Sequence, residues 1–219
     1  MDPISTGKIT LVCGYRRTGK DTFFIKISSS PGNKLETLFK WRVFALNPSH
    51  IKFDEFNSVR TAFADSLKEE ASEEYNIPLV VPDVDKDIKQ FVHYKSEATV
   101  SARDIYLEWG AIRRTQDPDY WCKAAFKKVS LNEKINCVVT DWRYRNEATH
   151  VLNNYQNVTT VRLWRSDVPE PPAHIDSEHD LDNYRTDILL LRDDMEGELQ
   201  KAKEKFPQYV NYVATDITI

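Results

Sequence analysis

The sequence predicts an α/β protein whose core is a parallel sheet with helices on both faces. Short apolar runs alternate with segments of helical periodicity, and strands that alternate with helices form parallel sheets. The first apolar run ends in a glycine-bounded loop that opens a helix. The 219 residues, 41% hydrophobic and 29% charged, suit one globular domain.

Five apolar runs are predicted to be strands. The run that ends at Asp141 is apolar throughout, so we expect this strand to be buried on both faces. The run beginning at Val59 is also expected to be a buried strand. Residues 35–57 give no clear pattern and are left unassigned. The predicted strands are Lys8–Cys13, Val59–Ala64, Cys137–Thr140, Val158–Trp164 and Asp187–Leu191.

Helices are predicted where apolar residues recur at spacings of three and four. Asp65 or Ser66 is expected to cap the second helix, and Pro118 to lie near the first turn of the fourth. The predicted helices cover residues 19–28, 67–75, 101–114, a segment starting at 117, 148–155 and 195–206.

The segment 167–184 is long, polar and rich in proline, and it has no core pattern of its own. A loop of this length inside a compact domain is typical of a functional segment. Its histidines, His174 and His179, and their acidic neighbours match no standard zinc spacing. We therefore expect a lid that is mobile without ligand and closes over a site.

Composition and charge exclude several classes of protein. The 30 basic and 34 acidic residues give a net charge of −4, whereas general nucleic-acid binders are usually basic. The sequence has no run of about 18 apolar residues and no signal-peptide pattern at its start, so no membrane partner is expected. Three widely spaced cysteines favour a reducing compartment, here the cytoplasm.

The strongest chemical signal is the segment after the first strand, which has the spacing of a phosphate-binding loop. Its glycines permit a tight turn, its backbone N–H groups face an anion at the helix start, and Lys20 reaches the β- and γ-phosphates. Asp21 stands where a Ser or Thr usually contacts magnesium. The expected ATP-binding residues are Gly14, Tyr15, Arg16, Arg17, Thr18, Gly19, Lys20, Asp21 and Thr22.

A second signal is Asp141, which follows a buried strand. Ligands bind at the carboxyl ends of strands in open parallel sheets, and a carboxylate there suits magnesium; a turn cap is the plainer alternative. Arginines lie near the same edge, and guanidinium groups stabilise charge on a transferred phosphoryl group. These arginines are Arg16, Arg17, Arg113, Arg114, Arg143 and Arg145.

Eight short segments in order resemble the viral and phage deoxynucleoside monophosphate kinase family. They also resemble animal-type phosphomevalonate kinases, a sister branch with the same Gly-Lys-Asp loop. The matching segments are Gly14–Thr22, Phe63–Glu69, Tyr94–Lys95, Ser101–Arg103, Trp109–Gly110, Asp117–Trp121, Thr140–Arg143 and Ser177–Glu178.

The resemblance implies a P-loop kinase fold with five parallel strands in the order 2-3-1-4-5. It implies one domain over residues 1–219, with an acceptor-binding region at about 59–121 and a lid at about 167–184. The implied reaction moves the γ-phosphoryl group of ATP, with Mg²⁺, to a deoxynucleoside 5′-monophosphate. Both substrates are small molecules, neither nucleic acid nor membrane is expected as a partner, and a homodimer is left open.

The resemblance also assigns roles to residues. Lys20 and the loop amides hold the donor phosphates, Asp141 and Asp21 place magnesium, and Arg17 and Arg143 neutralise developing charge. Lys68, Arg103, Arg113 and Arg114 are candidates for the acceptor's phosphate, and Phe63, Tyr94 and Trp121 for stacking on its base. The remaining candidates for substrate contact are Asp65, Lys95 and Glu178.

Two alternatives stay open. Arg17 resembles the nucleotide branch, whereas Trp109-Gly110 and Asp117-Pro118 are closer to the phosphomevalonate branch, so phosphomevalonate kinase is the first alternative. The second is a nucleotide-binding regulator that kept the loop and lost transfer activity. Retention of Lys20 and Asp141 argues against that loss.

Overall fold

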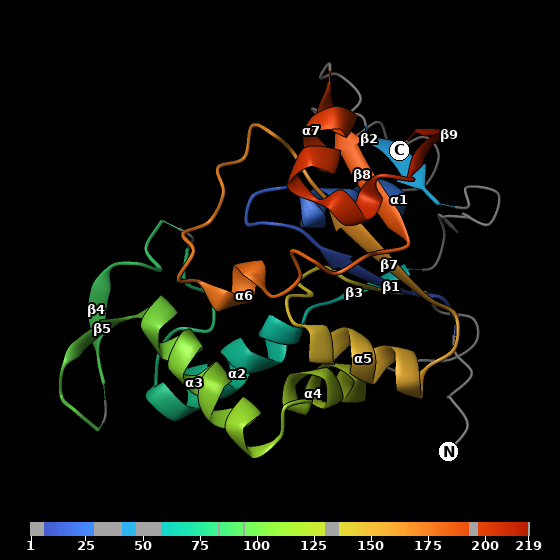
Figure 1. The fold of residues 1–219 in the computed structure, drawn as a ribbon. Coiled ribbons are helices and arrows are strands. Elements are labelled where there is room, and N and C mark those ends of the chain that lie inside the picture. The colour runs from blue at the N-terminus through green and yellow to red at the C-terminus, as the bar shows by residue number, and fades with distance from the viewer. Residues whose placement is uncertain are drawn as a thin grey trace. The chain divides into compact units, whose positions relative to one another are not determined.

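The computed structural model describes residues 7–28, 41–46, 58–82, 84–93, 95–129, 136–192 and 197–218. The chain divides into two compact units. The sheet unit consists of Met1–Thr61 with Leu131–Ile219, and the helical unit consists of Ala62–Ser130. The central sheet belongs to the first unit, and three helices and a small hairpin belong to the second (Figure 1).

The central sheet has seven strands in the order β3-β6-β1-β7-β8-β2-β9. The first five in that order are parallel to one another, which confirms the predicted α/β class with a mostly parallel sheet. β2 runs antiparallel to β8, and β9 antiparallel to β2, so the sheet is wider than the expected five strands. The strands are β1 (Ile9–Cys13), β2 (Trp41–Ala45), β3 (Ser58–Thr61), β6 (Asn136–Val139), β7 (Val158–Leu163), β8 (Ile188–Arg192) and β9 (Val213–Thr218).

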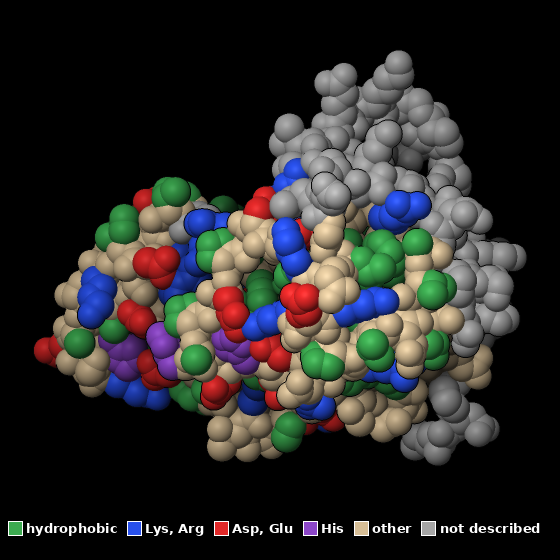
Figure 2. Space-filling model, turned by 45° about the horizontal axis from the view of Figure 1, so that its top comes forward, with side chains coloured by type: hydrophobic (Ala, Val, Ile, Leu, Met, Phe, Trp, Pro, Cys, Tyr) green, Lys and Arg blue, Asp and Glu red, His purple; other side chains and the backbone are tan. Residues whose placement is uncertain are grey.

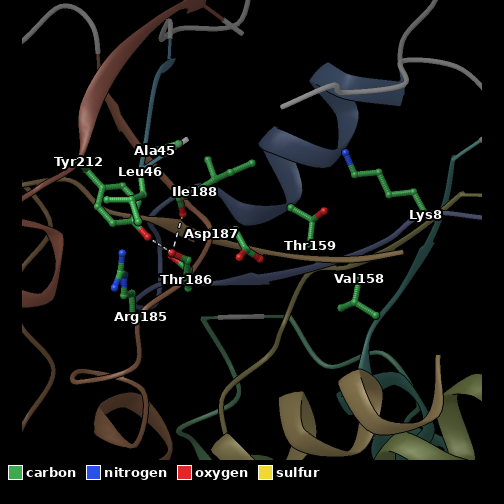
Figure 3. Close-up of a pocket in the computed structure, with 10 residues that line it drawn as sticks. All are labelled: Lys8, Ala45, Leu46, Val158, Thr159, Arg185, Thr186, Asp187, Ile188 and Tyr212. Atoms are coloured by element: carbon green, nitrogen blue, oxygen red, sulfur yellow. Dashed lines mark hydrogen bonds between the residues drawn. The ribbon is translucent and has the colours of Figure 1, made fainter. Parts of the chain in front are cut away.

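Alternate side chains of β8 support two hydrophobic cores, one on each face of the sheet. Ile188 and Leu190 join the cluster that contains Phe23 of α1 (Lys20–Ser28). Leu189 and Leu191 join the cluster that contains Phe206 and the buried face of α7 (Glu198–Lys205), followed by the 3₁₀ turn η2 (Pro207–Tyr209). Successive side chains of a strand point to opposite faces, so α1 and α7 cover opposite faces. The helix α5 (Arg145–Asn154) also lies across the sheet from α1 (Figures 1 and 3).

The region around Val59 differs from the expected buried strand. β3 ends at Thr61 and lies at the edge of the sheet, where Val59 is 41% exposed. An edge strand has a single neighbour, which leaves more of its side chains in contact with water. The helix α2 (Phe63–Tyr75) begins earlier than predicted, with Ala62 as its N-cap; the expected caps, Asp65 and Ser66, are inside it.

The helical unit packs its helices around aromatic side chains. Trp121 is 1% exposed, and its indole N–H donates to the carbonyl oxygen of Gly110 at 3.3 Å. Phe63 is 3% exposed and meets Phe126 edge-on at 6.1 Å between ring centres. Ser101 and Asp104 form a capping box at the start of α3. The unit contains α2, the hairpin strands β4 (Lys89–Val92) and β5 (Thr99–Ser101), α3 (Ala102–Gln116) and α4 (Tyr120–Lys128).

None of the helices in the described part of the chain combines the length and apolar character needed to cross a bilayer.

Because Trp121 is packed on all sides, its removal leaves a cavity in the helical unit. We expect Trp121→Ala to lower the free energy of unfolding by about 3–5 kcal/mol, measured by urea denaturation. Leu107→Ala is the control in the same unit, since Leu107 is 56% exposed and its loss should cost about 0.5 kcal/mol or less. Equal effects of the two substitutions would contradict the core position of Trp121.

Candidate functional site

The glycine loop (Gly14–Gly19) joins the carboxyl end of β1 to the start of α1. Gly14 and Gly19 have φ angles of +143° and +100°, and Arg17 has +68°. A Cβ atom on Gly14 would lie 2.4 Å from the carbonyl oxygen of Leu163. The backbone of β7 therefore leaves no room for a side chain at position 14, and glycine is required there.

Lys20 folds back over this loop. Its Nζ donates to the carbonyl oxygens of Gly14 at 2.7 Å and Tyr15 at 3.0 Å. Burial, and after it the nearby positive charge of Arg143, lower the pKa of Lys20 to about 8, while the negative charges of Glu178 and Asp141 oppose that shift. A cation held this close to the helix start is placed to meet an anion.

The other residues of the loop divide into buried and exposed members. Thr18 is fully buried, and its hydroxyl donates to the Tyr15 carbonyl at 2.9 Å, so it shapes the loop. The Arg16 N–H donates to Glu178 Oε2 at 3.1 Å. The side chains of Arg17 and Thr22 are exposed, which leaves Arg17 open to solvent at the tip of the loop.

Asp21 and Asp141 are connected through the end of β6. Asp21 Oδ1 accepts from the Thr140 hydroxyl at 3.0 Å and from Arg60 Nε at 3.0 Å. Thr140 directly precedes Asp141, so both carboxylates lie at the same edge of the sheet as Lys20. Carboxylate oxygens are the ligands that Mg²⁺ prefers, and this pair has the chemistry to hold it.

The structure describes one group of three residues with metal-ligand spacing, formed by Glu170, His179 and Asp182 within 4.8 Å. His179 Nδ1 lies 2.8 Å from Asp182 Oδ2, and its Nε2 lies 3.1 Å from the Pro171 carbonyl oxygen. The hydrogen bond that His179 donates to the Asp182 carboxylate raises the pKa of His179. Both ring nitrogens therefore lie within hydrogen-bond distance of an oxygen, and hydrogen bonding within the segment accounts for this group.

Arg143 is positioned by a residue that the sequence reading missed. The Glu147 carboxylate, 3% exposed, accepts from the backbone N–H groups of Arg143 at 2.9 Å and Tyr144 at 3.0 Å. These bonds fix the turn between β6 and α5, and Arg143 Nη1 then pairs with Glu178 Oε1. A glutamate at the third position of a helix is a capping signal that could have identified this role.

The segment between β7 and β8 is held by contacts that sequence patterning does not reveal. It contains the short helix α6 (Asp176–His179), and Leu181 beside it is 5% exposed. Arg162, a buried arginine of β7, donates to the Leu181 carbonyl oxygen and, at 3.0 Å, to the Tyr209 hydroxyl. In the sequence, the only sign of this role is that Arg162 is a single charge in its predicted strand.

Basic and acidic side chains are interspersed on the face drawn in Figure 2.

The expected acceptor residues lie in the helical unit in several environments. Phe63 and Trp121 are in its core, which leaves no ring face open for stacking. Arg113 pairs with Glu70 at 3.0 Å and Arg103 pairs with Asp87. Lys95 is exposed, Arg114 is partly buried next to Gly110, and Tyr94 lies outside the described residues.

Asp65 and Lys68 line a pocket of about 330 Å³ within the helical unit. Their side chains are 3.7 Å apart. The pocket combines two lysines, two carboxylates, one tyrosine and a short apolar wall. Its lining residues are Asp65, Lys68, Glu69, Leu79, Val80, Val81, Lys86 and Tyr106.

A larger pocket of about 470 Å³ lies in the sheet unit, away from the glycine loop (Figure 3). Lys8, Val158 and Ile188 line it, and they mark the amino ends of β1, β7 and β8. The glycine loop follows the carboxyl end of β1, so the two features occupy opposite edges of the sheet. Phosphate ligands of parallel α/β sheets bind at the carboxyl edge.

No protein-family model matches this chain, and no curated protein sequence matches it either.

The close approach at Gly14 gives a test of the loop geometry. Gly14→Ala should cost about 3 kcal/mol or more of folding stability, because its Cβ would strike the Leu163 carbonyl. Gly197 is the matched control, since it also has a positive φ, +74°, but a Cβ there meets nothing within 4 Å. Gly197→Ala should cost about 1–2 kcal/mol, and equal melting-temperature losses would contradict the geometry.

The lowered pKa of Lys20 predicts a pH dependence. Between about pH 8 and its ordinary value of 10.5, the unfolded chain binds more protons at Lys20 than the folded chain does. The stability of the wild type should therefore rise through this window relative to Lys20→Met. Well below pH 8 the difference in stability between the two proteins should stay constant, because Lys20 is then protonated in both the folded and the unfolded chain.

The measurement is the difference in melting temperature between the two proteins at pH 7, 8, 9 and 10. A difference that stays constant from pH 8 to 10 would show that Lys20 is not buried as described.

Proposed function

We propose that this chain is a kinase that transfers the γ-phosphoryl group of ATP to the phosphate of a deoxynucleoside 5′-monophosphate. The observation that carries the proposal is Lys20, whose ammonium is buried against the glycine loop at the carboxyl edge of a parallel sheet. A strand, a glycine loop with positive φ angles and a helix starting at lysine form the context that phosphate binding requires.

The donor half of the proposal uses residues of the sheet unit alone. The loop N–H groups and Lys20 bind the β- and γ-phosphates, and Arg143 and the exposed Arg17 neutralise charge on the transferred group. Asp21 and Asp141 offer oxygen ligands at the same edge, and these fit Mg²⁺. Magnesium, when bound, offsets the negative charge of the triphosphate.

The transfer breaks the bond between the γ-phosphorus and the β–γ bridging oxygen and forms a bond to an oxygen of the acceptor's phosphate. ADP leaves with the bridging oxygen and its electron pair. The attacking phosphate oxygen is already an anion, so a strong general base is not needed. The residues therefore act by positioning and by stabilising charge.

For the acceptor half, we assign the monophosphate to the pocket lined by Asp65 and Lys68 and not to the expected aromatic residues Phe63 and Trp121. Lys68 and Lys86 provide cations for the acceptor's phosphate, and the half-buried Tyr106 provides a ring for stacking. Stacking of a base on an aromatic ring contributes about 1–3 kcal/mol. Asp65 remains from the original candidates as a hydrogen-bond acceptor at this pocket.

Phosphomevalonate is the second candidate acceptor, and one observation favours it. Three aromatic residues favoured a nucleotide over phosphomevalonate because they could stack on a base. Two of them, Phe63 and Trp121, are buried and offer no surface for stacking. The lysines of the same pocket would serve a carboxylate as well as a phosphate.

The test is an acceptor screen with ADP release as the readout. We expect turnover with at least one of dTMP, dGMP, dCMP or dAMP, and loss of turnover by orders of magnitude in Lys20→Met. Turnover with phosphomevalonate alone would assign the second candidate. ATP binding without turnover on any acceptor would favour a nucleotide-binding regulator.

The acceptor pocket is tested by Lys68→Gln. We expect the KM for the monophosphate to rise about tenfold and the KM for ATP to stay unchanged. Lys123→Gln is the control, because Lys123 is exposed and pairs with Asp117 at 2.8 Å. Equal changes in both KM values would contradict an acceptor role for Lys68.

A further inference from the structure

Glu178 contacts the glycine loop as an anion would. Its Oε2 accepts from the Arg16 backbone N–H at 3.1 Å, and its Oε1 pairs with Arg143 Nη1. The side chain of Glu178 is only 9% exposed. Both oxygens of the carboxylate are thus engaged, one by a loop amide and one by a guanidinium group.

These two donors are the kinds of group that bind phosphate. Backbone N–H groups of such loops and arginine forks recognise anions because they present fixed positive dipoles and charge. Glu178 lies close enough to Lys20 for its charge to act on that ammonium. A phosphate group that binds the Arg16 N–H and Arg143 must first displace the Glu178 carboxylate.

Neighbouring contacts hold the segment that carries Glu178 against the same surface. Asp180 Oδ2 accepts from the Arg145 N–H at 2.7 Å, and its carbonyl accepts from Arg145 Nε at 2.8 Å. The Tyr15 hydroxyl donates to Asp182 Oδ1 at 3.0 Å. Each contact joins the segment between β7 and β8 either to the glycine loop or to the start of α5, all within the sheet unit.

We infer that Glu178 is an internal competitor that occupies part of the phosphate site in the ligand-free protein, so that triphosphate binding requires the segment around α6 to release the glycine loop. This inference rests on the proposed function, and it assigns Glu178 a role opposite to substrate binding. Because only the open molecules bind triphosphate, the apparent affinity is the intrinsic affinity multiplied by the fraction of molecules that are open. In return, an empty site does not expose its donors to other anions.

The first experiment compares inorganic tripolyphosphate binding by calorimetry in wild type, Glu178→Gln and Asp180→Asn. Glu178→Gln removes the competing charge and keeps the shape, so its dissociation constant should fall about tenfold. Asp180→Asn is the matched control, because Asp180 holds the same segment without touching the glycine loop. Its dissociation constant should change by less than about threefold.

Three results would overturn the inference. Weaker binding by Glu178→Gln would show that the carboxylate supports the anion site by holding Arg143 and does not compete for it, and equal binding would make its contact irrelevant. Equal tightening in Asp180→Asn would show that general loosening of the segment is responsible. If no variant binds tripolyphosphate at 10 mM, about the upper limit of a specific site, both the phosphate site and the competitor are refuted.

A second measurement separates this inference from the kinase proposal. Hydrogen exchange of the glycine loop should be faster in Glu178→Gln than in wild type without ligand, because the Arg16 N–H loses its charged acceptor. If Glu178→Gln binds tripolyphosphate more tightly and exchanges faster, but no acceptor is turned over, the kinase proposal is refuted and the competitor role of Glu178 is supported. Turnover on an acceptor, together with unchanged tripolyphosphate affinity and unchanged hydrogen exchange in Glu178→Gln, would support the kinase and refute the competitor.

Discussion

The buried ammonium of Lys20 is the interaction on which the arrangement of the candidate site depends. A cation removed from water is costly unless polar groups compensate it, and here the carbonyl oxygens of Gly14 and Tyr15 do so. The glycine loop must curve around the ammonium to present these oxygens. Gly14, with its positive φ and close approach to β7, begins this curve.

Carboxylates hold the loops around the candidate site. Glu147 holds the turn after β6, and Glu178, Asp180 and Asp182 hold the segment after β7. Because their partners are backbone N–H groups, an arginine and a tyrosine hydroxyl, the bonds can be exchanged for bonds to a polyanion. The segment that the sequence predicts to be a lid is docked by these contacts, and the inferred release would have to break them.

The sequence predicts the parts of this fold whose signals are local. β1, β6 and β8 are mainly apolar runs, β7 interrupts its apolar residues with two threonines and Arg162, and the glycine loop has a distinctive spacing. β2 lies in the stretch 35–57 that gave no clear pattern, and its antiparallel pairing with β8 and β9 joins distant parts of the chain. The sequence also does not predict which aromatic side chains are buried. A tryptophan such as Trp121 could stack on a base or fill the core, and the local sequence does not distinguish these two roles. Arg162 acts through the Leu181 carbonyl and the Tyr209 hydroxyl, which only folding brings close, whereas Glu147 bonds N–H groups three and four residues away and could be identified from its capping position.

The most direct measurement is the structure of the protein with magnesium and a non-hydrolysable ATP analogue. The account predicts that the β- and γ-phosphates lie on the N–H groups of the glycine loop, with Lys20 Nζ moved from the Gly14 carbonyl to a phosphate oxygen. It also predicts that the Glu178 carboxylate has left the Arg16 N–H. A triphosphate bound instead at the amino edge of the sheet, in the pocket of Figure 3, with Lys20 still on the Gly14 carbonyl, would contradict the account.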